Sequence, residues 1–162
     1  MSVKLPADVY APDQVGIVLW ELGRLIGQLR DASTRASVTG KAEPAREFHA
    51  SASLLSVLSE TKVSAEDYKA LEKLQTELQD IRSKAPVAHV LLSALPNQTL
   101  KRQLVEWCRE NLHKELLMTF ATRGDMGGGF ILRIGSKQYD FTYRAQLLEN
   151  RHRLTEIFDN VR

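Results

Sequence analysis

A run of three glycines, Gly127-Gly128-Gly129, is the first candidate for chemistry, because glycine-rich loops can bind phosphate groups through their backbone amides. A phosphate-binding loop of this kind also needs a lysine followed by a serine or threonine after the last glycine. Here Phe130 and Ile131 follow, so the side chains that would contact phosphate and magnesium are missing. We therefore expect a tight entry into a strand, where glycine permits a positive φ or a close approach of two backbones.

Histidine and cysteine show no spacing that is typical of a metal site or a catalytic group. Zinc ligands usually come in closely spaced pairs, and the four histidines stand far apart: His49, His89, His113 and His152. The single cysteine, Cys108, lies beside Trp107 in an apolar pattern, so we expect a small core residue and no disulfide within the chain. The sequence nominates no catalytic residue, metal or cofactor. An unrecognised enzyme stays a further alternative, for which the sequence offers no candidate catalytic residue.

Three arginines in the last expected helix, Arg144, Arg151 and Arg153, are candidates for contacts with phosphate groups. They would suit a small RNA-binding module, because cationic contacts to the nucleic-acid backbone dominate such affinities. Few aromatic residues stand near them, and a nucleic-acid binder normally shows a stronger basic patch. We therefore expect a solvated helix face and keep RNA binding as the alternative function.

The first expected helix carries a subtler candidate, a face made of Gly16, Trp20, Gly23 and Gly27. Each glycine inside a helix costs about 0.5–1 kcal/mol relative to alanine, so these glycines need a compensation. Close approach of a second helix would provide one. That helix comes either from within the chain or from a partner that lies in a groove with Trp20 as its anchor. These four residues are the candidate partner-binding site, and intramolecular packing stays open as the other explanation.

Periodic apolar residues predict a helical first half. A helix is expected over Asp13–Asp31, whereas residues 32–44 have no period and indicate a loop. A second helix is expected over Ala45–Glu60, and a third from Ser64 to about Ser83, with a serine–aspartate capping box at its start. Their expected apolar faces are Phe48, Ala52, Leu55 and Leu58 in the second helix and Leu71, Leu74, Leu78 and Ile81 in the third.

The second half alternates between strand and helix patterns. The expected elements are a strand over Ala88–Leu95, a helix over Gln98–Leu112, a strand over Leu116–Thr122, a hairpin over Gly129–Ile134 and Lys137–Phe141, and a last helix over Tyr143–Phe158 capped by Thr142. The helix before the second strand should pack through Leu100, Leu104, Trp107, Cys108 and Leu112. This order predicts an α+β fold, in which an N-terminal helical bundle precedes a small α/β domain.

Composition and charge are those of a globular protein with two unlike halves. The chain has 162 residues, 43% hydrophobic and 26% charged, which excludes disordered and collagen-like proteins. Residues 1–86 carry a net charge of −1 and residues 87–162 a net charge of +3, and we place the domain boundary between them. The most apolar stretch, Val15–Leu29, contains charged residues, and Met1–Tyr10 lacks the apolar core of a signal peptide. We expect a cytosolic protein with no segment across a membrane.

The second half contains an ordered set of short motifs. A strand ends in Ser-Ala, a Gly-Gly precedes an apolar strand, a glycine turn leads to a second strand that ends in Asp, and a helix opens with Arg-x-x-Leu. Together these motifs resemble the C-terminal part of the ATP synthase delta subunit, the family of the oligomycin sensitivity-conferring protein. The family usually has Asp-Gly-Ser where this chain has Asp-Phe-Thr. The matching residues are Ser93, Ala94, Gly128, Gly129, Gly135, Asp140, Arg144 and Leu147.

The resemblance implies a non-catalytic stator subunit of an F-type ATP synthase. In that family a six-helix N-terminal domain binds N-terminal helices of the alpha subunits, and the C-terminal domain holds the end of the b-subunit stalk. The resemblance therefore implies alpha, beta and b subunits as partners, without a cofactor, lipid insertion or nucleic acid. It places the chain at the cytoplasmic face of the inner membrane. With only 86 residues before the boundary, it implies a shortened N-terminal domain.

Overall fold

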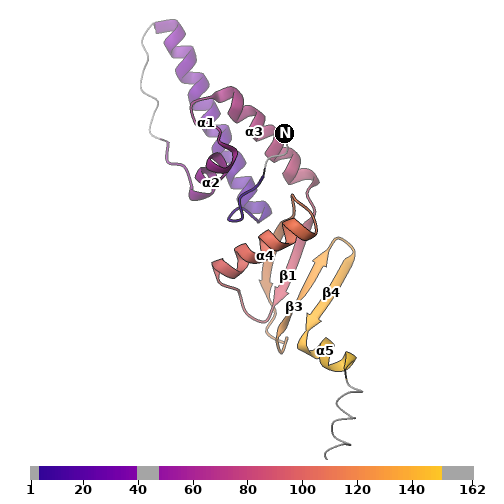
Figure 1. Ribbon diagram of the computed structural model, residues 1–162. Helices are drawn as coiled ribbons and strands as arrows, with labels where there is room; N and C mark the ends of the chain where they lie inside the picture. Colours follow the sequence, from indigo (N-terminus) through magenta and orange to yellow (C-terminus); the bar gives the residue numbers. More distant parts are fainter. Residues whose placement is uncertain (1–3, 40–47, 151–162) are drawn as a thin grey trace, which may run out of the picture.

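The first half of the chain folds into helices that share one core. The computed structural model describes residues 4–39 and 48–150, and its helical half contains α1 (Pro12–Thr39), α2 (Ala52–Thr61) and α3 (Tyr68–Lys84). α1 and α3 lie side by side, and α2 packs against α1 (Figure 1). Their apolar faces meet in a core whose fully buried members include Val15, Val18, Leu22, Leu54, Val57, Leu71 and Leu78.

α1 is longer than its apolar pattern predicts. The expected loop over residues 32–44 is wrong for residues 32–39, because α1 continues to Thr39. Its last turns extend beyond α3 (Figure 1), so they face solvent and need no apolar stripe. Two hydroxyl groups bond to carbonyls of the preceding turn, Thr34 Oγ1 to Arg30 O at 2.9 Å and Ser37 Oγ to Thr34 O at 2.7 Å. These residues are therefore accommodated in the helix.

α2 begins later than the sequence predicts, because Ser51 is its N-cap. Ser51 Oγ accepts a hydrogen bond from Leu54 N and donates one to Glu21 Oε2 at 2.8 Å, which fixes the start of α2 against α1. The expected helix is therefore wrong over residues 48–51, which are not helical. Residues 45–47 lie outside the described part of the chain.

The face that α2 turns to the core also differs from the expected one. Leu54 and Val57 are fully buried, whereas Leu55 is 56% exposed. Phe48 and Leu58 are partly buried against the same core. α2 is short and carries apolar residues on several sides, so its sequence fits two neighbouring stripes. Only packing against α1 decides between them.

The prediction for α3 is right about its face and wrong about its start. All four residues of the expected face are buried: Leu71, Leu74, Leu78 and Ile81. The helix begins at Tyr68 because Asp67 is the N-cap, whose carboxylate accepts hydrogen bonds from Lys69 N and Ala70 N. Ser64 instead belongs to a preceding turn, in which its carbonyl accepts from Asp67 N at 3.3 Å.

The second half forms a four-stranded mixed sheet, which confirms the α+β class. Its elements are β1 (Val87–Leu92), α4 (Gln98–Asn111), β2 (Leu117–Thr122), β3 (Gly129–Ile134), β4 (Lys137–Thr142) and α5 (Tyr143–Glu149). The strand order is β2-β1-β3-β4, in which β1 and β2 are parallel and the other pairs antiparallel. The expected first strand is wrong beyond Leu92. Of the expected last helix, residues 151–158 lie outside the described residues.

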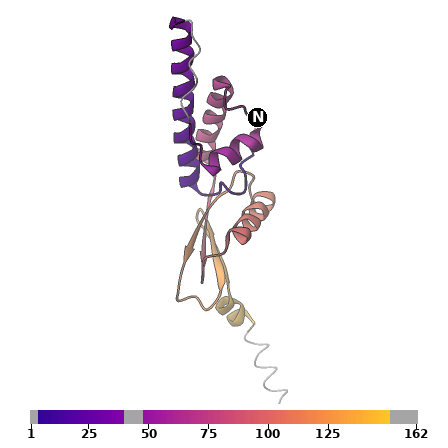
Figure 2. The same ribbon diagram turned by 90° about the vertical axis from the view of Figure 1, so that its left-hand side faces the viewer.

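α4 packs on one face of this sheet, toward its β2 side. Figure 2 shows the sheet nearly edge-on with α4 on one side of it. Lys101 Nζ lies 5.8 Å from the centre of the Phe120 ring, and Arg109 Nε donates to Leu116 O at 3.2 Å, so both ends of α4 contact the β2 region. Val105 and Cys108 of α4 are buried against this face in one cluster with Ala88, Val90, Leu116, Met118 and Leu132.

The N-terminal segment, residues 4–11, joins the two halves through Arg109 of α4. The guanidinium donates to the backbone carbonyls of Leu5, Pro6 and Val9 at 2.9–3.0 Å. Burial lowers the pKa of Arg109 to about 10, so the group is still charged at neutral pH. A partly buried cation therefore ties three carbonyls of the segment to α4.

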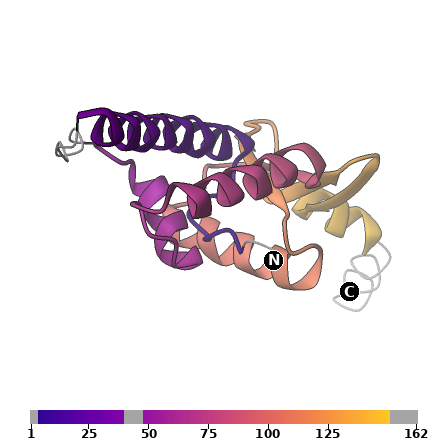
Figure 3. The same ribbon diagram turned by 90° about the horizontal axis from the view of Figure 1, so that it is seen from above.

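The same segment also pairs with the edge of the sheet. Tyr10 O accepts a hydrogen bond from Met118 N at 2.7 Å, and the Tyr10 ring meets the edge of the Phe120 ring at 5.5 Å between centroids. Figure 3 shows the segment beside α4 and next to the helical half. Leu117 of β2 is buried in the helical core. The two halves thus share a core as well as these hydrogen bonds.

Candidate functional site

The glycines of the candidate partner-binding face have different surroundings in α1. A Cβ on Gly16 would lie 3.4 Å from Arg82 Cζ, and one on Gly23 would lie 3.3 Å from Gln75 Nε2, so both glycines face side chains of α3. Apart from the neighbouring residues and nearby backbone of α1 itself, no described atom lies within 4 Å of a Cβ built on Gly27. Packing within the helical half therefore accounts for Gly16 and Gly23 and leaves Gly27 unexplained.

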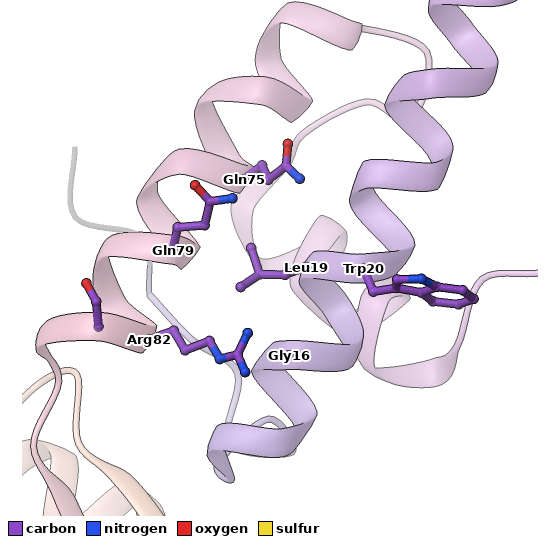
Figure 4. Close-up of a pocket in the computed structure, with 7 residues that line it drawn as sticks. Gly16, Leu19, Trp20, Gln75, Gln79 and Arg82 are labelled. Carbon is purple, nitrogen blue, oxygen red and sulfur yellow. The ribbon is translucent and has the colours of Figure 1, made fainter.

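Trp20 borders a pocket between α1 and α3 and is 62% exposed. Figure 4 shows its indole ring pointing away from α3. Figure 4 shows Gln75, Gln79 and Arg82 on the side of α3 that faces α1. The pocket has a volume of about 540 Å³ and is lined by Gly16, Leu19, Trp20, Gln75, Gln79, Arg82 and Ser83. The guanidinium of Arg24 lies 4.9 Å from the centre of the indole ring, which holds the ring at the surface. Exposed indole, amides and guanidinium suit contact with another protein.

Most residues of the delta-subunit motifs gather at one end of the sheet. The strand register brings five of them to that end: Ser93, Ala94, Gly128, Gly129 and Asp140. Gly135 lies at the opposite end, in the turn between β3 and β4, with a φ of 57°. Arg144 and Leu147 are exposed on α5. The motif residues therefore lie at both ends of the sheet and on α5.

The glycines before β3 permit close packing against the end of β4. Gly128 and Gly129 have φ values of 132° and 84°, and a Cβ on Gly129 would overlap the carbonyl oxygen of Phe141, which confirms the tight strand entry. Hydrogen bonds from the hydroxyl and backbone N–H of Thr142 lower the pKa of Asp140. Thr142 Oγ1 also accepts from an N–H in the first turn of α5 at 3.2 Å, as expected of its cap.

A second surface, which the sequence did not reveal, is an apolar groove between α4 and the β3–β4 hairpin. Trp107, Leu112, Tyr139 and Phe141 are between 43% and 56% exposed along it. Its volume is about 480 Å³, and it is lined by Val90, Leu104, Trp107, Cys108, Leu112, Met118, Phe130, Leu132, Ile134, Lys137, Tyr139 and Phe141. We call these residues the apolar groove.

The apolar face expected for α4 is only partly right. Cys108 is buried as predicted, and Val105, which was not part of that face, is fully buried. Leu100, Trp107 and Leu112 are about half exposed. The apolar arc of α4 is wider than its contact with the sheet, so one side rests on the core and the other borders the groove. The exposed aromatics Tyr139 and Phe141, two residues apart on β4, were the signal in the sequence for an open strand face.

Residues 4–39 and 48–150 contain no arrangement typical of a metal site: no three His, Cys, Asp or Glu side chains lie close enough to hold an ion. Burial raises the pKa of Cys108, which disfavours its thiolate. Within the same ranges no helix has the length and apolar character needed to cross a membrane.

Of the arginines considered for RNA binding, Arg144 is exposed on α5, and Arg151 and Arg153 lie outside the described residues. No contact in the described chain favours a nucleic-acid interface at Arg144. The RNA-binding alternative therefore stays an untested prediction.

Comparisons with known proteins do not identify a family. No family model matches the chain, and no curated protein matches it. The resemblance to the delta subunit therefore rests on the motif residues of the second half alone.

Proposed function

We propose that the chain is a non-catalytic stator subunit of an F-type ATP synthase, which links the catalytic head to the b-subunit stalk and resists the torque of the rotor. The observation that carries the proposal is the exposed Trp20 at the pocket between α1 and α3. Tryptophan is highly buried on average in folded proteins and is enriched at the centres of protein interfaces. The motif residues of the sheet half support the same family.

The surface around Trp20 has the features that a partner's helix requires. Gly27 lies two turns along α1 from Trp20, and the space beside it is open. A helix that crosses α1 there can approach its backbone closely and place apolar side chains against the indole. Gln75 and Gln79 of α3 border the pocket and can bond to the polar rim of such a helix. On this proposal the helix is the N-terminal helix of an alpha subunit.

The contacts between the two halves of the chain suit a subunit that connects two other parts of a complex. Residues 4–11 are bonded to Arg109 and Met118, so a load applied to one half reaches the other through several hydrogen bonds as well as through the chain itself. A stator must also dissociate slowly, which requires tight binding. A nanomolar dissociation constant corresponds to about −12 kcal/mol.

Calorimetry with a synthetic peptide of the alpha-subunit N-terminal helix tests the proposal on the full chain. We expect Trp20→Ala to weaken binding at least about tenfold, the loss typical of an interface hot spot. Val38→Ala is the matched control, because Val38 is 80% exposed on the same helix and lies away from the pocket. Both variants should keep the helical circular dichroism of the parent.

Two results would contradict the proposed function. One is equal affinity of the parent chain and Trp20→Ala for the alpha-subunit peptide. The other is failure of the tagged full chain to co-purify with alpha, beta and b subunits from a detergent extract of the cells that produce it.

A further inference from the structure

We infer that the free edge of β4 pairs with the β4 edge of a second copy of the chain, in an antiparallel, two-fold arrangement with Tyr139 at its centre. The inference goes beyond the proposed function, because it concerns the chain by itself and does not involve the surface around Trp20. It follows from the direction of the backbone groups of β4, from what lies beside each edge of the sheet, and from the side chains that the pairing brings together.

The two edge strands of the sheet, β2 and β4, differ in what lies beside them. At β2 the N-terminal segment is bonded to the edge, because Met118 N donates to Tyr10 O at 2.7 Å. Beyond β4, Figure 1 shows no other labelled helix or strand. The edge of β2 is therefore covered, whereas the edge of β4 is open within the described part of the chain.

The backbone groups that point outward from β4 follow from its register with β3. Tyr143 N donates to Gly128 O at 3.3 Å, so the backbone groups of the odd-numbered residues point to β3. Those of Gln138, Asp140 and Thr142 therefore point outward. In agreement, Thr142 N donates to Asp140 Oδ1 at 2.9 Å. Among the described residues, the N–H and C=O groups of Gln138 and Asp140 have no partner and remain for a further strand.

β4 has few of the features that keep edge strands apart. Proteins usually protect an open edge with proline, a bulge, a very short strand or inward-pointing charges. β4 pairs with β3 without interruption from Lys137 to Thr142 and contains no proline. Its charged residues are Lys137 and Asp140. Such an edge is a template for another strand, and a second copy of the chain carries an identical one.

One antiparallel register satisfies all four free backbone groups of each copy. It pairs Gln138 of each copy with Asp140 of the other, about a two-fold axis at Tyr139. A pairing of Asp140 with Asp140 would set two carboxylates opposite each other and would need Thr142 N, which is already bonded. A pairing of Gln138 with Gln138 would place Asp140 opposite Ser136, in the turn between β3 and β4. The first register is therefore favoured.

The side chains of this register complement one another on both faces of the sheet. On one face the amide of Gln138 lies opposite the carboxylate of Asp140, which pairs a donor with an acceptor. On the other face the two copies of Tyr139 form a non-hydrogen-bonded pair, whose Cβ atoms lie about 4.5 Å apart. Lys137 lies opposite Phe141, so its ammonium group can contact the ring. No like charges face each other among these pairs.

The exposed aromatic side chains of β4 add apolar surface to the contact. Tyr139 and Phe141 are 45% and 43% exposed, and their rings stack at 6.5 Å between centroids. Phe141 also packs against Phe130 at 4.9 Å. Rings that are already ordered lose little side-chain entropy when a second copy covers them. Two six-residue strands still form a small interface, so we expect a reversible dimer with a dissociation constant of about 10–500 μM.

Sedimentation velocity and amide NMR on the full chain test the inference. Between about 5 μM and 1 mM, we expect the sedimentation coefficient to rise with concentration. Over the same range the backbone N–H groups of Gln138 and Asp140 should become slower to exchange with solvent, because the second copy accepts their hydrogen bonds. The N–H groups of Tyr139 and Phe141 already bond to β3 and should change less.

Two substitutions at one position test the register. Gln138→Glu places a carboxylate opposite Asp140 of the second copy and should weaken the dimer about two- to thirtyfold over the two equivalent pairs. Gln138→Lys should strengthen it by a similar factor. Arg133 lies opposite Gln138 within the sheet, so glutamate should stabilise the folded monomer and lysine should destabilise it. Leu55→Lys is the control, because Leu55 is 56% exposed on α2, and it should leave the dimer unchanged.

Three results would overturn the inference. One is a constant sedimentation coefficient up to about 1 mM. Another is weaker association in both Gln138→Glu and Gln138→Lys, which would mean that Gln138 faces its own copy. The third is a dimer that forms only when the chain is cut after Asn150, which would mean that the chain's own last residues cover the edge. The alpha-subunit peptide test concerns another surface, so its failure leaves these readouts unchanged.

Discussion

Replacing Arg109 by lysine should loosen the N-terminal segment from the rest of the protein. The three nitrogen atoms of the guanidinium together donate four hydrogen bonds, which go to the carbonyls of Leu5, Pro6, Val9 and Leu116. The single nitrogen of lysine keeps the charge but cannot reproduce this fork. We expect at least two of the four bonds to be lost.

The size of the effect follows from the number of bonds. A hydrogen bond from a charged donor contributes about 1.5–3 kcal/mol, and water replaces part of what is lost, so Arg109→Lys should cost about 2–4 kcal/mol. This loss is a large share of the 5–15 kcal/mol that holds a typical domain together. It should appear first as local opening of residues 4–11, since these residues depend most on Arg109.

Amide hydrogen exchange at Met118 is the direct assay, because its N–H bonds to Tyr10 O at 2.7 Å. At 2 kcal/mol the exchange of this amide should become about 30-fold faster. The control is Arg102→Lys, since Arg102 pairs with Asp8 at 3.2 Å but both side chains are more than half exposed, and such pairs contribute little. Unchanged exchange at Met118 in Arg109→Lys, or equal acceleration in the control, would refute the reasoning.

Three further predictions concern two glycines and the acid dependence of stability. Gly129→Ala should lower the free energy of unfolding in urea by more than about 2 kcal/mol, because its positive φ and the Phe141 carbonyl leave no room for a methyl group. Gly27→Ala should raise it by about 0.5–1 kcal/mol, because nothing lies near its Cβ in a helix interior; a loss there would contradict the open environment. The pKa of Asp140 is lowered by Thr142, so its stabilising contribution is full above the ordinary aspartate pKa and is lost as the pH falls through the lower folded value. Carboxyl titration by NMR should show this lowered pKa, and an ordinary value would disprove the hydrogen bonds behind it.

Local patterns predicted the parts of the fold that depend on local contacts. The hairpin turn at Gly135, the cap at Thr142 and the tight entry at Gly129 each follow from residues within a few positions of one another. The face of α3 was also readable, because the residues from Leu71 to Ile81 form a single stripe with no competing one. In such segments sequence and packing favour the same arrangement.

Long-range packing decided the features that the sequence did not reveal. The end of α1 lies beyond the core and has no apolar stripe. The sequence of residues 32–39 therefore shows no helical periodicity of apolar residues. The apolar groove exists because α4 covers only the β2 side of its face of the sheet and leaves the side of the β3–β4 hairpin open. No property of α4 alone determines which side it covers. The bonds of Arg109 to Leu5 span 104 positions, a separation that no local pattern records. The sequence set Trp20 apart from the apolar stripe because it shares a face with glycines, and left open whether that face packs within the chain or against a partner. In the structure Trp20 is exposed.

The position of Leu117 in the core of the helical half also affects the order in which the protein can fold during its synthesis. Leu5 and Val9 belong to the core of the helical half, yet that core also includes Leu117. Ribosomes add about 5–20 residues per second, so the first half has to wait several seconds for its last core residue after its own helices have been made. The helical half therefore emerges with an incomplete interior, which a chaperone can bind. The two halves reach their final state together, late in translation.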